Sequence, residues 1–379
     1  MKKAITLLVC LVLCIVGYAR TISISSETEL REIATNVNNG NAYEGDTIRL
    51  DTSITLTTEW TPIGKSNKPF RGVFDGQNNT ISNLHITNGG DYSALFGLLE
   101  GVVENVIVKG VIVSANNSGH ISGIVGLAWR KGTLVRNCHF IGSITATTSE
   151  AKDLFVGGVV GELKDGAVVS GCSATGKIRG NWTGGGQAKC IGGVVGRCGP
   201  QTSSTDNVCI IENCINLANV RGYSSVGGII AFARQHAVIK DCLNCGNIEG
   251  NEATKNYFGG IVGGYYKDVE MRNCLSTGTT FSSHPSAAIG KVSTNEFSDV
   301  CPKINIYYDY QRMSENYSRH GDSVYTDMCI NGNLLPDVDK WTQTEGYPIP
   351  CGFTNDSVNY SRSKERVLRA SPIRVDRNA

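Results

Sequence analysis

The segment VRNCHFIGSI (residues 135–144) is the most informative stretch of the sequence, because the same phrase returns four more times along the chain. It reads VSGCSATGKI at 169–178, IENCINLANV at 211–220, IKDCLNCGNI at 239–248 and MRNCLSTGTT at 271–280. Each copy places Asn, Asp or Gly before a Cys, and Gly or Ala four residues after it. This recurrence indicates an array of structural repeats.

A second phrase alternates with the first and consists of two apolar residues between two small ones. Its copies are Ala94–Gly97, Gly123–Gly126, Gly158–Gly161, Gly193–Gly196, Gly228–Ala231, Gly260–Gly263 and Ala287–Gly290. Between the phrases lie short segments rich in Val and Ile, punctuated by Gly, Asn and Asp, with no helical periodicity. Units of two or three short strands around a common axis predict an all-β fold, a parallel β-helix.

The residue before the recurrent Cys predicts a column of corners. In a β-helix equivalent residues lie about 4.8 Å apart on successive coils. Asn tolerates the left-handed conformation and Gly adopts it freely, so both suit a sharp corner. The predicted corner column is Asn83, Asn105, Asn137, Gly171, Asn213, Asp241, Asn273 and Asn305.

The next position predicts a column of core residues, because plain hydrophobic side chains share it with cysteines. Its members are Leu84, Val106, Cys138, Cys172, Cys214, Cys242, Cys274 and Ile306. A buried free Cys behaves as a small hydrophobic residue, so this interpretation makes the thiols packing groups. Disulfides between neighbouring coils stay open as an alternative. A metal site is not expected, because the column offers no His or carboxylate.

Two stretches, WTPIGKSNKPFRGVFDGQNNTISNLHI (60–86) and ALFGLLEGVVENVIVKG (94–110), resemble the GLUG-motif repeat family. The resemblance covers about residues 21–350. It implies secreted or surface-attached bacterial proteins, common in Bacteroidetes, and a right-handed parallel β-helix. Some members carry a metalloprotease domain, but the chain has no His-Glu-x-x-His motif.

The first 19 residues have a Lys-Lys start, an apolar run and a Gly-Tyr-Ala end, which predict a cleaved secretory signal peptide. Leu13 before Cys14 argues against a lipoprotein. The predicted parts are signal 1–19, N-terminal cap 20–45, β-helix 46–310, C-terminal cap 311–355 and a basic, disordered tail 356–379. An exported protein, secreted or at the outer cell surface, follows, with the periplasm as the alternative.

Within these parts, Ser26 and Glu29 form a capping box for a short helix over 26–40 that covers the first coil. Disulfides are possible in an exported chain. Candidate staples join Cys198 to Cys209 and Cys329 to Cys351.

No catalytic constellation emerges from the sequence. The six His residues are scattered over different units, and Asp75 reads as a turn residue of the repeat. The glycine-rich stretches open no helix inside a βαβ unit, so they indicate corners rather than phosphate loops. The net charge of +1 gives no basic field for nucleic acid. We therefore expect no cofactor, no metal, no nucleic acid partner and no membrane span in the mature chain.

One more column suggests binding. The positions three residues after the small-apolar-apolar-small phrase include Trp129, Lys164, Arg234 and Tyr266. Aromatic and cationic side chains in a line suit a glycan. The sequence thus favours a non-enzymatic surface or secreted adhesion and recognition module for a glycan or host protein. A polysaccharide lyase or glycoside hydrolase on the same scaffold, and a structural component of a surface assembly, are the alternatives.

Overall fold

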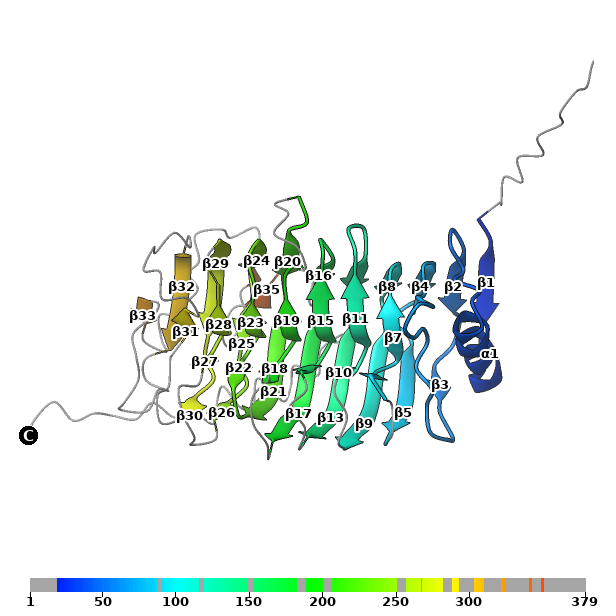
Figure 1. The fold of residues 1–379 in the computed structure, drawn as a ribbon, viewed down its shortest axis with the longest axis horizontal. Helices are drawn as coiled ribbons and strands as arrows, with labels where there is room; N and C mark the ends of the chain where they lie inside the picture. Colours follow the sequence, from blue (N-terminus) through cyan, green and yellow to red (C-terminus); the bar gives the residue numbers. More distant parts are fainter. Residues whose placement is uncertain are drawn as a thin grey trace, which may run out of the picture.

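The computed structural model describes residues 19–87, 90–115, 119–148, 153–182, 189–200, 206–250, 257–266, 268–281, 288–292, 303–309, 322–324, 341–342 and 349–350. The chain winds into a parallel β-helix whose coils stack along the long axis, with helix α1 at the amino end (Figure 1). The predicted β-helix with an N-terminal helix is confirmed. Residues 1–18 of the predicted signal peptide 1–19, Cys329, Cys351 and the predicted tail 356–379 lie outside the described residues.

Most complete coils contribute two strands to the largest sheet and one strand to each of two smaller sheets. Among the described residues the largest sheet has 20 strands, and its two faces meet at the predicted corner. Its strands are β1 (Thr21–Ile24), β2 (Thr47–Leu50), β3 (Ile54–Thr55), β4 (Val73–Asp75), β5 (Thr80–Ile86), β8 (Val102–Glu104), β9 (Ile107–Ala115), β12 (Leu134–Arg136), β13 (His139–Thr148), β16 (Val168–Ser170), β17 (Ser173–Trp182), β20 (Cys209–Glu212), β21 (Ile215–Gly222), β24 (Ala237–Lys240), β25 (Leu243–Asn244), β26 (Ile248–Gly250), β29 (Val269–Ser276), β30 (Thr280–Phe281), β32 (Lys303–Asp309) and β33 (Asp322–Val324).

Two smaller sheets close the coil. The six-stranded sheet holds β6 (Tyr92–Ser93), β10 (Gly119–Ser122), β14 (Leu154–Gly157), β18 (Lys189–Gly192), β22 (Ser225–Gly227) and β27 (Tyr257–Gly259). The seven-stranded sheet holds β7 (Phe96–Leu99), β11 (Val125–Trp129), β15 (Val160–Lys164), β19 (Val195–Cys198), β23 (Ile230–Ala233), β28 (Val262–Tyr265) and β31 (Ile289–Val292). A separate antiparallel pair, β34 (Trp341–Thr342) and β35 (Ile349–Pro350), contains the buried Trp341.

The corner residues adopt the left-handed conformation. All eight members of the predicted column have φ between 51° and 64°. Several amides also bond from coil to coil: Asn137 Nδ2 donates to Asn105 Oδ1 at 3.2 Å, and Asn305 Nδ2 donates to Asn273 Oδ1 at 2.9 Å. These side chains therefore turn the chain and join neighbouring coils.

The first position of each predicted column, Asn83 in the corner column and Leu84 in the core column, was assigned wrongly. Strand β5 pairs with β9 through a register shift between Ile81 and Leu84, and Leu84 lies opposite Gly110 rather than Val106. Asn83 has φ 60° but sits within this irregularity, and the N–H of Asn78 bonds to the Asn105 carbonyl instead. An irregular strand shifts the sequence spacing without losing the turn residue.

The thiol column lies inside the β-helix. From Val106 through the five cysteines to Ile306, each side chain is buried beside its equivalent on the next coil. Each of the five thiols donates to the carbonyl two residues earlier, at 3.1 to 3.3 Å. The thiol therefore fills core volume and bonds a carbonyl beside the corner.

The small-apolar-apolar-small phrase marks a second sharp corner, where the six-stranded sheet passes into the seven-stranded sheet. A side chain on either end glycine of this phrase would collide with backbone or core atoms. A Cβ on Gly161 would lie 2.9 Å from the Ile121 nitrogen, and a Cβ on Gly158 would lie 2.3 Å from the Ala174 Cβ. The last small residue thus lets the two smaller sheets approach each other on the outside of the coil. The first leaves room inside for core side chains of β17, such as Ala174.

Helix α1 (Glu27–Asn38) covers the first coil with its buried face of Leu30, Ile33, Ala34 and Val37. Its N-cap Ser26 accepts the Glu29 N–H at 3.3 Å, and Glu29 Oε2 accepts the Ser25 N–H at 2.8 Å. The cap covers strand edges and core that the coil end leaves open.

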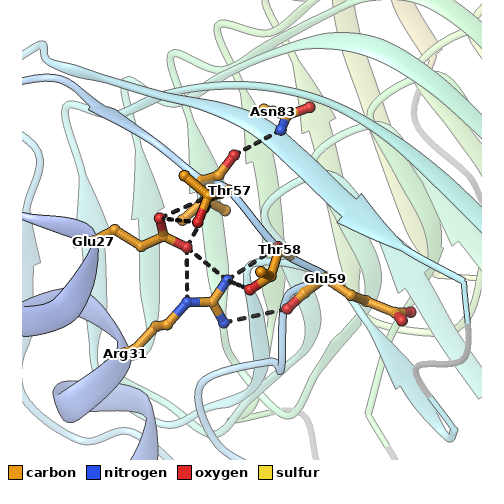
Figure 2. Close-up of polar contacts among 7 residues, drawn as sticks. Glu27, Arg31, Thr57, Thr58, Glu59 and Asn83 are labelled. Atoms are coloured by element: carbon orange, nitrogen blue, oxygen red, sulfur yellow. Dashed lines mark hydrogen bonds and ion pairs between the residues drawn. The ribbon is translucent and has the colours of Figure 1, made fainter.

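Polar contacts tie this helix to the second coil (Figure 2). Glu27 accepts the Thr57 N–H at 3.0 Å and the Thr57 hydroxyl at 2.8 Å. Arg31 pairs with Glu27 at 2.8 Å and donates to the backbone carbonyls of Thr58 and Glu59 at 3.0 and 3.2 Å.

Candidate functional site

The predicted binding column divides into two parts. Trp129, the last residue of β11, pairs in register with Lys164, the last residue of β15. Arg234 and Tyr266 follow two and three coils beyond Lys164, as the N–H groups of Gly199, Arg234 and Tyr266 bond from coil to coil. At the spacing of strands, Arg234 lies about 14 Å from Trp129 along the axis. The structure therefore brings Trp129 and Lys164 together and leaves Arg234 and Tyr266 apart from them.

The indole of Trp129 is held in place by its neighbours. Its Nε1 donates to Asp165 Oδ2 at 2.6 Å. The Arg130 guanidinium lies 5.2 Å from the ring centroid and the Lys164 ammonium 5.6 Å from it, both within the range of cation–π attraction. Arg130 is in turn paired with Glu100 at 3.0 Å. The Trp129 ring thus holds two cations by cation–π contacts at the end of the strand.

An open hollow of about 290 Å³ adjoins this indole, lined by Trp129, Arg130, Lys131, Asp165 and Asn207. The lining combines an aromatic ring, two cations, a carboxylate and an amide. Lys131 is exposed. Among the residues that the structure describes, it forms no ion pair. The hollow therefore presents donors, an acceptor and one free cation to a ligand.

At the other end of the column, Tyr266 packs against Phe232, with ring centroids 5.2 Å apart and planes nearly perpendicular. Arg234 is half-buried, and its Cβ would meet a Cβ on Gly199 at 2.4 Å. Gly199 therefore leaves a gap in the row between Lys164 and Arg234.

A second polar cluster, which the sequence did not predict, fills the outer corner between the two smaller sheets. We call it the corner cluster: Tyr92, His120, Phe155, Glu162 and Arg197. Glu162 bonds His120 Nε2 at 2.8 Å and Arg197 Nε at 2.8 Å. The His120 ring stacks on Tyr92 at 5.3 Å and leans on Phe155 at 5.6 Å, and Arg197 lies 3.6 Å above the Phe155 centroid.

The carboxylate of Glu162 is ionised inside this cluster. It is only 3% exposed, and burial alone raises a carboxyl pKa. The hydrogen bond from His120 and the charge of Arg197 outweigh that effect and lower the pKa of Glu162 to about 2. Both carboxylate oxygens are bonded within the cluster, so they join coils and do not face a substrate.

Burial raises the pKa of five of the described cysteine thiols. Burial raises the pKa of Cys172 and Cys198 well above the ordinary range, which keeps both thiols protonated and inert. The predicted staple between Cys198 and Cys209 is not formed, because both are buried free thiols in the core. Within the described ranges no group of three His, Cys, Asp or Glu side chains could hold a metal ion.

Comparison with known proteins gives two likenesses. No protein-family profile matches the chain. It is 33% identical over 141 residues to Halomucin of Haloquadratum walsbyi, an alignment that covers 34% of this chain and 1% of Halomucin. The chain thus spans about a hundredth of that relative's length.

A solved structure from Bacteroides ovatus, described as "a putative immunoglobulin A1 protease", superposes with a TM-score of 0.58. The match covers 88% of this chain and 92% of the other at 21% identity, so the two share a fold. No helix in the described part of the chain has both the length and the apolar character needed to cross a membrane.

Proposed function

We propose that this chain is an exported, non-enzymatic recognition module that binds an extracellular glycan at the hollow beside Trp129. The observation that carries the proposal is the composition of that hollow, in which a fixed indole adjoins donors, a carboxylate and an amide. Planar polar groups around an aromatic ring suit the hydroxyl groups and apolar faces of a sugar.

The setting supports an extracellular role. The N-terminal segment has the sequence of a secretory signal. The regular β-helix offers a long side on which an extended ligand can lie (Figure 1). Membership of the GLUG-motif repeat family, and with it attachment at a bacterial surface, is part of the same proposal and rests on the motifs at 60–86 and 94–110.

The rival enzymatic function would use the corner cluster, where acidic and basic groups do converge. His120 and Arg197 are both bonded to Glu162 within 2.8 Å. Glu162 is buried and engages both His120 Nε2 and Arg197, and the other ring nitrogen, His120 Nδ1, is also buried, without a hydrogen-bond partner among the described residues. A lyase or hydrolase needs at least one of them open to its substrate. The name of the structural relative adds nothing here, because that likeness is one of fold.

A glycan array probed with the wild type and two variants tests the proposal. We expect Trp129→Ala to lose at least about tenfold in affinity for the glycans that the wild type binds. Phe281→Ala, which removes an exposed aromatic ring far along the large sheet, is the matched control and should keep the wild-type profile. Urea unfolding verifies that both variants fold.

Two results would count against this function. One is a Trp129→Ala variant whose array profile equals that of the wild type. The other is release of shortened or unsaturated sugars from a polysaccharide panel, abolished by His120→Ala, which would favour the enzyme instead.

A further inference from the structure

We infer that the hollow beside Trp129 takes an anionic sugar unit, bearing a carboxylate or a sulfate ester, and that Lys131 contacts that charge. The inference rests on the proposed function and narrows its ligand to one chemical class. Three cations, Arg130, Lys131 and Lys164, lie on the hollow or against its indole.

The three cations differ in the ion-pair and cation–π contacts that they already make. Arg130 is paired with the Glu100 carboxylate at 3.0 Å and also lies over the indole. Lys164 lies over the same indole. Lys131 is exposed and lacks an ion-pair partner among the described residues. The positive charge available to a ligand in the hollow is therefore that of Lys131.

The remaining lining favours a sugar over an acidic peptide. Asp165 lines the hollow with its carboxylate, which the Trp129 indole holds at 2.6 Å. A carboxylate accepts hydrogen bonds from the many hydroxyls of a sugar, whereas the side-chain carboxylates of an acidic peptide offer it no donor. Asn207 adds an amide that both donates and accepts. A ligand that is anionic at one point and rich in hydroxyls elsewhere fits both sets of groups.

Beyond the hollow, the predicted binding column offers a second cation, Arg234. Gly199 carries no side chain, and Arg234 follows on the next coil with no ion pair among the described residues. An anionic polymer that leaves the hollow along the axis would meet this second free cation after about 14 Å. The row therefore suits repeated negative charges rather than a single one.

The test measures binding of three oligosaccharides with the same backbone: a neutral cello-oligosaccharide, its C6-oxidised uronate form and its sulfated form. At low salt we expect at least one anionic form to bind about tenfold more tightly than the neutral one, and salt should shrink the difference. Lys131→Ala should abolish the difference. Lys109→Ala, which removes an exposed lysine on β9, should leave it intact.

Three other outcomes would overturn the inference or change the class of ligand. Equal affinity for all three sugars, unaffected by Lys131→Ala, overturns the inference and leaves the proposed function standing. Absence of binding to any of them at millimolar concentration, together with a blank glycan array, overturns both. Binding of poly-glutamate as tightly as the anionic sugars, with the same loss in Lys131→Ala, replaces the glycan by an acidic peptide. The uronate and sulfated forms distinguish the two anions.

Discussion

Substitution of Glu162 by Gln should remove a pH-dependent part of the stability of this β-helix. The pKa of Glu162 is about 2 in the folded protein, against about 4.3 for an unfolded Glu. A carboxyl whose pKa is lowered by folding stabilises the fold above its unfolded pKa, and that contribution disappears as the pH falls towards the folded pKa. With about 1.4 kcal/mol per pKa unit, the contribution is about 3 kcal/mol at pH 7 and about half of that at pH 3.

Urea unfolding followed by circular dichroism at pH 7 and pH 3 measures the effect. We expect Glu162→Gln to be about 3 kcal/mol less stable than the wild type at pH 7, because His120 and Arg197 lose their partner. The deficit should shrink to about half at pH 3. Glu104→Gln is the matched control, since Glu104 pairs with the more exposed Arg136 and should change stability by less than about 1 kcal/mol. A deficit for Glu162→Gln that is the same at both pH values would refute the reasoning.

Three further changes test the architecture. Gly161→Val places a Cβ 2.7 Å from the Gly126 carbonyl oxygen, so the variant should lose several kcal/mol of stability in urea unfolding. Ala231→Gly in the equivalent position should cost at most about 1 kcal/mol. Equal losses for the two variants would contradict the close packing at this corner. Cys214→Val should change stability by less than about 1.5 kcal/mol, since an apolar side chain of similar size fills the slot; loss of folding would show that the thiol is indispensable. Glu27→Ala removes the bonds to Thr57 and should speed hydrogen exchange in β1–β3 about tenfold while later coils keep their rates; uniform exchange along the chain would contradict a local cap.

The corners and the core were predictable because each is set by one residue type at one place in the repeat. Positive φ selects Asn, Gly or Asp at positions such as Asn137 and Gly171, and an inward slot selects Cys or an aliphatic residue at Cys138. These preferences are local, so the sequence displays them directly. The prediction failed at Asn83, because a register shift in β5 breaks the spacing while leaving a plausible turn residue.

The corner cluster was missed because it depends on how two sheets meet. His120 and Glu162 are 42 residues apart and lie on different sheets, which come close together at the glycine corner. One signal was present. Glu162 and Arg197 occupy the position directly after the small-apolar-apolar-small phrase in successive units, and register places them side by side. Opposite charges at one repeat position predict such an ion pair.

The candidate binding site was predicted in part. The sequence placed Trp129 and Lys164 in one column, and register pairs them. The contributions of Lys131, Asp165 and Asn207 depend on loops that follow different strands, and repeat counting does not align these residues.

A crystal structure of the protein with a bound anionic oligosaccharide would show which residues hold the sugar. We expect the sugar to occupy the hollow beside Trp129, with its carboxylate or sulfate within hydrogen-bond distance of Lys131 Nζ and a hydroxyl donating to Asp165. An oligosaccharide bound elsewhere on the β-helix, with Trp129 and Lys131 untouched, would contradict it.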